Sequence, residues 1–168
     1  MRAFLSKLSF GIDVRVNMLG SLASWLTTVL MLVMCVDVLL RYAFDLTQTW
    51  VIELEWHLFA ILFLVGASYT LLYDKHVRVD MFYERYPQRW KGRVNAFGTL
   101  LLLVPWCIII MIKGFDYTAN SWSFREGSPQ PNGLPARYLI KAFIPIGFGL
   151  LLLQAISEII RSLIRKKG

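Results

Sequence analysis

The stretch that decides the fold is residues 19–40, LGSLASWLTTVLMLVMCVDVLL, in which Asp37 is the only charged residue. An α-helix of this length extends about 33 Å, which is enough to cross the roughly 30 Å hydrocarbon core of a bilayer. Inside lipid a segment must satisfy its own backbone polar groups, so we expect a transmembrane helix here.

Three further stretches share this character: residues 51–73, 94–112 and 138–160. Each is long enough to span, and ionisable side chains fall near the ends of these stretches rather than at their centres. The sequence therefore predicts an all-α membrane protein, with four transmembrane helices in a single domain over residues 1–168.

The composition excludes several classes of protein. The chain is 57% hydrophobic and 17% charged, whereas soluble domains are nearer 45–50% and 25%. The net charge of +7 is explained by basic membrane loops, so no nucleic acid is expected. Cys35 and Cys107 lie inside apolar stretches and are interpreted as small core residues. We expect no disulfide, no cofactor, no soluble catalytic unit and no enzyme activity.

The distribution of basic residues predicts the orientation. Thirteen of the 18 lysines and arginines lie in the N-terminal stretch, in the loop between the second and third spans, and in the C-terminal tail. Basic loops resist translocation, so both termini and the middle loop are predicted to be cytoplasmic. The chain would then be a multi-pass protein of a bacterial inner membrane.

Two short segments have the pattern of interfacial helices. Phe4, Leu8 and Ile12 recur every four residues before the first span, and residues 79–86 repeat the pattern in the middle loop. In the third loop, helix is expected to continue through Phe124 before a turn-rich stretch rich in proline and glycine. Pro105 is expected to kink the third span. Small residues, namely Gly20 with Ser24 in the first span and Gly147 and Gly149 in the fourth, are expected to allow close helix approach.

Ionisable residues near the membrane are candidate functional groups. Asp37 precedes Arg41 by one turn, so an i,i+4 ion pair explains it, with contact to another subunit as the alternative. Glu53 and His57 share a face beside Trp50. They suggest either a proton relay, half of a metal site, or a polar contact at a subunit interface. The last is favoured, because a zinc site needs three or four ligands and the chain has two histidines.

A haem held by His57 and His76 is excluded, because 19 residues of helix separate them by about 28 Å. Two classes of protein remain as alternatives at this point. A self-sufficient, proton-coupled small exporter needs a central membrane carboxylate. A membrane anchor of a quinone-linked oxidoreductase needs a quinone or haem site.

The motifs together resemble one family, the small membrane subunit of TRAP (tripartite ATP-independent periplasmic) transporters. The segment His76-Val77-Arg78-Val79-Asp80 is the most specific part of the resemblance. The other matching positions are Arg41-Tyr42, Trp50, Glu53, Gly66-Ala67, Gly133-Leu134-Pro135, Lys141, Pro145-Ile146 and Leu151-Leu152-Leu153-Gln154. The long third loop departs from the family pattern and suggests a longer-loop subgroup.

The resemblance implies a scaffold rather than a transport site. In this family a large many-helix subunit carries the substrate and sodium sites, and a periplasmic binding protein delivers the solute, often an organic acid. The candidate contacts to these partners or to the bilayer are Asp37, Arg41, Trp50, Glu53, His57, His76, Arg78 and Asp80. We expect the face of Trp50, Glu53 and His57 to take part, because those polar groups need partners at the membrane edge.

Overall fold

A computed structural model describes residues 2–73 and 97–165, and these ranges contain helices and no β-strand. The helices are α1 (Arg2–Phe44), α2 (Thr49–Leu72), α5 (Val104–Ser123), which follows the π-helical turn η1 (Thr99–Leu103), and α6 (Tyr138–Arg165). Each of the four, with η1 counted as part of α5, contains an apolar stretch long enough to cross a membrane. The prediction of four spanning helices is confirmed.

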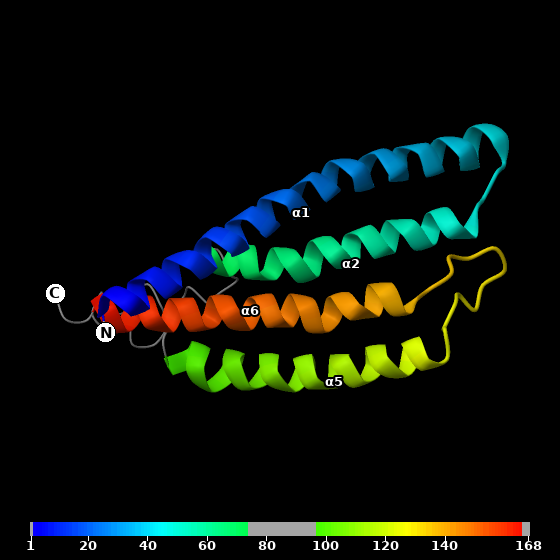
Figure 1. The fold of residues 1–168 in the computed structure, drawn as a ribbon. Coiled ribbons are helices and arrows are strands. Elements are labelled where there is room, and N and C mark those ends of the chain that lie inside the picture. Colours follow the sequence, from blue (N-terminus) through cyan, green and yellow to red (C-terminus); the bar gives the residue numbers. More distant parts are fainter. Residues whose placement is uncertain (1, 74–96, 166–168) are drawn as a thin grey trace.

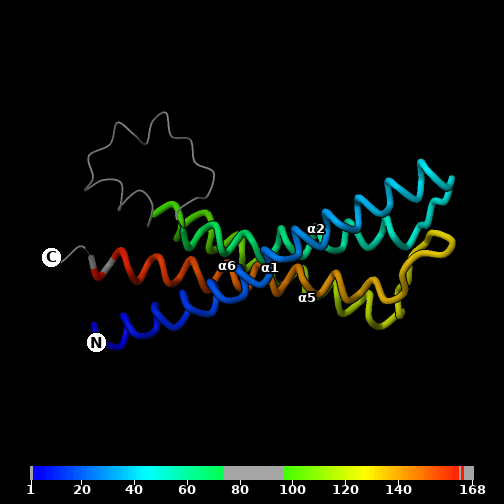
Figure 2. Tube along the Cα trace, turned by 90° about the horizontal axis from the view of Figure 1, so that it is seen from above, coloured from blue at the N-terminus to red at the C-terminus, as the bar shows by residue number. Residues whose placement is uncertain are grey.

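The helices form an open layer in the order α1, α2, α6, α5 (Figure 1). α2 packs against α1 and α6, whereas α5 packs mainly against α6. α1 runs obliquely and also contacts α6, near the start of α1 and the end of α6 (Figures 1 and 2). We call this end of the molecule the terminal end. The opposite end, where residues 45–48 and 124–137 connect the helices, is called the loop end.

Glycines allow the helices to approach closely where they cross. A Cβ atom added at Gly20 of α1 would overlap the ring of Tyr69 on α2. One added at Gly147 of α6 would lie 2.8 Å from the Cβ of Leu64 on α2. Gly114 has the same role between α5 and α6. The expectation of close approach at Gly20 and Gly147 is therefore confirmed.

The N-terminal segment differs from the prediction of a separate surface helix. It is helical, but it continues without a break into the first span, so that α1 is 43 residues long, or about 64 Å. No proline interrupts α1, and its buried Ser9 and Val16 pack against the rest of the molecule. The second predicted surface helix, residues 79–86, lies outside the described residues.

A π-helical turn precedes Pro105 in the third span, and the predicted kink there stays a prediction. Proline has no N–H to donate, and the preceding turn adopts π-helical geometry in which Val104 N–H bonds to the carbonyl of Thr99, five residues earlier. Beyond this point α5 continues to Ser123, as predicted for the first half of the third loop.

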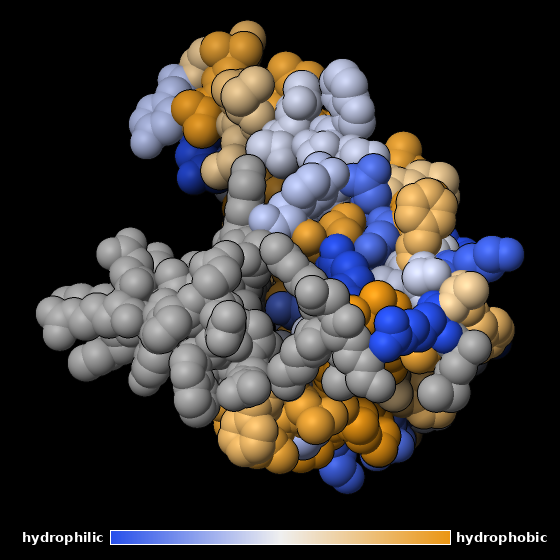
Figure 3. Space-filling model, turned by 90° about the vertical axis from the view of Figure 1, so that its left-hand side faces the viewer, coloured by the Kyte–Doolittle hydropathy of each residue, from blue (hydrophilic) through white to orange (hydrophobic). Residues whose placement is uncertain are grey.

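The core is small and the outer faces are apolar. Leu71, Cys107, Leu151 and Ala155 form its buried centre, so the core role predicted for Cys107 is confirmed. The same prediction for Cys35 is wrong, because Cys35 is exposed on α1, on a side that no helix of the described residues covers. Viewed from the terminal end, hydrophilic residues gather among the helix ends, with apolar residues along the sides (Figure 3).

Candidate functional site

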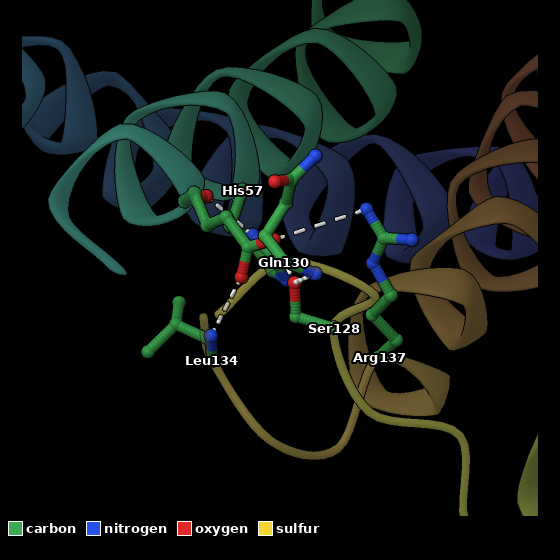
Figure 4. A network of polar contacts seen from close by, with 6 residues as sticks. His57, Ser128, Gln130, Leu134 and Arg137 are labelled. Atoms are coloured by element: carbon green, nitrogen blue, oxygen red, sulfur yellow. Dashed lines mark hydrogen bonds and ion pairs between the residues drawn. The ribbon is translucent and has the colours of Figure 1, made fainter. Parts of the chain in front are cut away.

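The buried carboxylate of Glu53 is the centre of a polar network at the loop end (Figure 4). Glu53 lies one turn inside α2 and is only 4% exposed. Its Oε2 accepts a hydrogen bond from the backbone N–H of Leu134 at 2.6 Å, and its Oε1 accepts one from the hydroxyl of Ser128. The guanidinium of Arg137 lies 3.9 Å from Oε1. Three groups of the connection 124–137 thus converge on one side chain of α2.

A tight turn shapes the connection for this contact. Gly133 N–H donates to the carbonyl of Gln130 at 3.2 Å, which closes a four-residue turn. Pro131 occupies its second position, and Asn132 has a φ of 59° at the third. This is the pattern of a type II turn, in which proline presets one φ and asparagine tolerates the left-handed region.

Backbone bonds then close the connection on itself. Ser128 N–H donates to the carbonyl of Leu134 at 3.1 Å, and Arg137 N–H donates to that of Glu126 at 2.9 Å. Gly133 faces the carboxylate, since an added Cβ would lie 2.8 Å from Glu53 Oε2. The connection therefore forms a compact strap that rests on α2, and we call residues 124–137 the strap.

Arg137 joins this strap to the aromatic edge of α2. Its guanidinium carbon lies 5.5 Å from the ring centroid of Trp56, within cation–π range. Its Nε is buried without a hydrogen-bond partner among the described residues. The charge of Arg137 thus faces both the Glu53 carboxylate and an aromatic ring.

A second ion pair fastens the strap to α5 and α6. The ammonium of Lys141 and the hydroxyl of Ser121 both donate to Glu126, the latter at 2.7 Å. These two hydrogen bonds lower the pKa of the Glu126 carboxyl below its ordinary value. Lys141 also lies 4.0 Å from the ring centroid of Tyr117. The strap is therefore attached to three helices.

The ion pair predicted between Asp37 and Arg41 is present. The guanidinium of Arg41 donates to the carboxylate of Asp37, which is 3% exposed. Glu53 and His57 share a face as predicted, but their side chains do not pair. His57 Nδ1 donates to the backbone carbonyl of Glu53, and its ring lies 4.0 Å from that of Trp56. Trp50 is exposed nearby.

The remaining candidates, His76, Arg78 and Asp80, lie outside the described residues. Partners for Glu53 were predicted in another subunit, whereas in the structure Ser128, Leu134 and Arg137 of the same chain surround its carboxylate. The turn-rich composition of residues 127–135 was the signal available for such a strap, but it does not indicate which helix the strap contacts.

A polar cluster at the terminal end was missed. Asp13 on α1 accepts hydrogen bonds from Gln154 at 3.1 Å and Ser157 at 2.7 Å on α6, and Arg161 lies 3.3 Å from its carboxylate. The hydroxyls of Ser9 and Ser157 are 2.7 Å apart and fully buried among the helices. The spacing of Gln154 and Ser157 in an otherwise apolar span was the available signal.

These contacts are suited to holding helices in place. The contacts of Glu53 and of Asp13 join elements that are far apart in the sequence, through charged, amide or hydroxyl side chains in a largely apolar surrounding. Within the described ranges, no group of three His, Cys, Asp or Glu side chains is placed to hold a metal ion. The fold and the contacts thus define a helical membrane protein whose polar side chains lock an open helical layer.

Comparison with known proteins identifies the family. Residues 30–165 match the model of the tripartite ATP-independent periplasmic transporters, DctQ component, and the chain belongs to this family. It is similar to the C4-dicarboxylate TRAP transporter small permease protein DctQ of Vibrio cholerae serotype O1, with 25% identity over 135 residues. That match covers 68% of this chain and 58% of the relative, so the chain spans less than two thirds of the relative's length. The chain is therefore a small permease subunit of the TRAP type and a component of a transporter.

Proposed function

We propose that this chain is a scaffold in the inner membrane of a bacterium. It supports a large multi-span subunit that carries the substrate and sodium sites, and a periplasmic binding protein delivers an organic acid to the pair. A C4-dicarboxylate is the first solute to test, because the similar Vibrio cholerae protein carries that solute in its name.

The observation that carries this proposal is that the buried and half-buried carboxylates bind groups of the same chain rather than forming an open substrate site. Glu53, Glu126 and Asp13 each bind groups of the same chain: the first two hold the strap on α2, α5 and α6, and Asp13 holds α1 against α6. The outer faces of α1 and α5 are apolar and mostly unburied within the chain. A rigid helical layer with apolar outer faces is suited to supporting a neighbour in the bilayer.

The orientation proposed is with both termini in the cytoplasm. α1 begins and α6 ends at the same end of the molecule, and most of the basic residues lie in the segments at that end or in the middle loop (Figure 1). The strap then faces the periplasm.

Aromatic side chains near the strap are proposed to help receive the binding protein. Phe115, Tyr117, Trp122 and Phe124 are all more than half exposed towards the loop end. Aromatic residues exposed in this way are frequent anchors of protein interfaces. Replacing them with alanine should weaken docking of the binding protein, and unchanged docking would contradict this assignment.

Co-purification tests the scaffold proposal directly. The tagged chain is co-expressed with the large membrane protein encoded beside it and purified in mild detergent. We expect the large subunit to co-elute in a constant ratio. A homogeneous, transport-active oligomer of this chain alone would overturn the proposal.

A further inference from the structure

One face of α2 is covered by no helix of the described residues. Two other faces are covered: Tyr69 meets Gly20 of α1, and Leu64 meets Gly147 of α6. The uncovered face follows a helical spacing of seven, four, three and four residues. We call it the outer face of α2, and its members are Ile52, Phe59, Phe63, Gly66 and Thr70.

Gly66 is the central feature of this face. A Cβ atom added there would meet nothing within 4 Å, in contrast to the two glycines at the crossings with α1 and α6. Glycine lowers helix propensity, and in membrane helices it favours close approach of another helix. Gly66 thus offers a position for close approach that the described chain leaves empty.

Two phenylalanines flank the glycine on the side of the loop end. Phe59 is 58% and Phe63 66% exposed, and their rings stack with centroids 6.3 Å apart. In a packed interface, large aromatic side chains such as these act as anchors, and the neighbouring glycine leaves a recess that a partner side chain can fill.

Glu55 lies at the edge of the same face, three residues after Ile52 and four before Phe59. It is partly exposed and begins about 9 Å inside α2, measured from Thr49. No hydrogen bond or ion pair reaches its carboxylate from the part of the chain that the structure describes.

The charges around Glu55 leave an excess negative charge. Its electrostatic neighbours are Asp37 and Arg41, and these two already form an ion pair with each other. A carboxylate within a membrane helix is costly unless a cation or a proton neutralises it. An acyl chain covers Phe59 and Phe63 but supplies no cation at the depth of Glu55.

We propose that the outer face of α2 receives a transmembrane helix of the large subunit, packed against Gly66, with a basic side chain of that helix paired to Glu55. This rests on the proposed function and adds to it the face of the chain and the chemistry of the contact. The partner is a membrane helix rather than lipid, because one face carries an open glycine and a carboxylate that no described residue pairs, and both favour a protein neighbour.

The test uses the complete co-expressed pair, with the large subunit recovered on the tagged chain as the readout. Gly66→Leu fills the recess without a clash inside the chain, and Glu55→Gln removes the charge. Each is expected to reduce recovery, the glycine variant by about tenfold, as for a residue at the centre of an interface. The matched controls on α5 are Ala119→Leu, an exposed alanine given the same bulk, and Asp116→Asn, an exposed carboxylate.

A second measurement separates association from folding. The thermal stability of the chain expressed alone should not fall in Gly66→Leu, since leucine favours helix over glycine. A photo-crosslinking residue in place of Phe59 should join the large subunit, whereas one in place of Leu102, exposed on η1, should not.

The outcomes distinguish a failure of the proposed function from a failure of the proposed docking face. If the wild-type chain does not recover the large subunit, the proposed function is wrong. If the wild type recovers it and both Gly66→Leu and Glu55→Gln recover it in full, the docking face is wrong while the function stands. A crosslink from the Phe59 position to lipid or to a second copy of this chain also overturns the docking face.

Discussion

Replacing Gly133 with alanine probes whether the strap is held on α2 by close contact. The new Cβ atom would lie 2.8 Å from Glu53 Oε2 and would overlap the side chain of Ser128. Those two side chains are joined by a hydrogen bond, so the methyl group enters between the strap and the carboxylate. We expect the strap to move away from α2 in this variant.

The expected cost follows from the crowding. Non-bonded atoms do not approach a Cβ within 3.0 Å, so the strap or the carboxylate must shift. Crowding of this kind typically costs about 1–3 kcal/mol. For a chain of this length each kcal/mol lowers Tm by about 2–4 °C, so a cost near the middle of the range predicts a fall of about 4–8 °C.

Gly127→Ala is the matched control within the same strap. A Cβ atom at Gly127 meets nothing within 4 Å, so its Tm should change by no more than about 2 °C. Both variants are heated in the same detergent at one scan rate, because unfolding in detergent is often irreversible. Tryptic cleavage after Arg125 and Arg137 reports local opening of the strap below Tm.

Tm and the rate of tryptic cleavage together test whether Gly133 is packed against Glu53. If Gly133 is packed against Glu53, Gly133→Ala melts at a lower temperature and is cleaved faster than Gly127→Ala. Equal Tm values and equal cleavage rates for the two variants would refute the idea that Gly133 is packed against Glu53.

Three further changes test other contacts. Gly147→Ala forces α2 and α6 apart at Leu64 and should cost about 1–3 kcal/mol, seen as a lower Tm than that of Gly149→Ala, whose new Cβ makes an ordinary contact; equal Tm values would contradict the close crossing. Glu126→Gln should lower Tm at pH 7, and the difference from wild type should shrink as the pH is lowered: the pKa of Glu126 is depressed in the folded state, so the stability that its charge contributes is fully present above the unfolded-state pKa and is lost as the pH falls through the folded-state pKa. A Tm difference that stays constant as the pH falls would show that the charge is not responsible. Asp37→Asn should cost about 1 kcal/mol, because the arginine partner is 43% exposed, and a Tm equal to wild type would mean that the pair contributes nothing.

The parts of the fold that depend on local pattern were predictable from the sequence. The four spans follow from runs of apolar residues, and the Asp37–Arg41 pair follows from a one-turn spacing. Close helix approach at Gly20 was predictable because small residues in membrane helices mark crossings. In each case the relevant residues are neighbours in the sequence or lie on one helix.

The polar contacts that lock the molecule were not predictable in the same way. Glu53 binds Ser128 and Leu134, which are 75 and 81 residues away, and Ser9 meets Ser157 across 148 residues. Such partners depend on how helices are ordered in the layer, which hydropathy does not specify. The carboxylate of Glu53, near the end of a span, therefore suggested a contact with a second subunit, although its hydrogen-bond donors belong to the same chain.

The continuity of α1 was missed for a related reason. The amphipathic pattern of Phe4, Leu8 and Ile12 indicates which side of a helix is apolar, but not whether that helix continues into the next segment. Asp13, which the sequence analysis did not single out, is a part-buried residue of α1 whose carboxylate binds side chains of α6. The pairing with Gln154 and Ser157 holds the first turns of α1 against the layer.

The most direct test of the scaffold account is solute uptake into proteoliposomes with defined membrane components. Vesicles contain the large subunit alone, this chain alone, or both, with the binding protein and its solute outside and a sodium gradient across the membrane. The account predicts uptake when both subunits are present and none from this chain alone. Uptake by this chain alone, or equal uptake by the large subunit with and without it, would contradict the account.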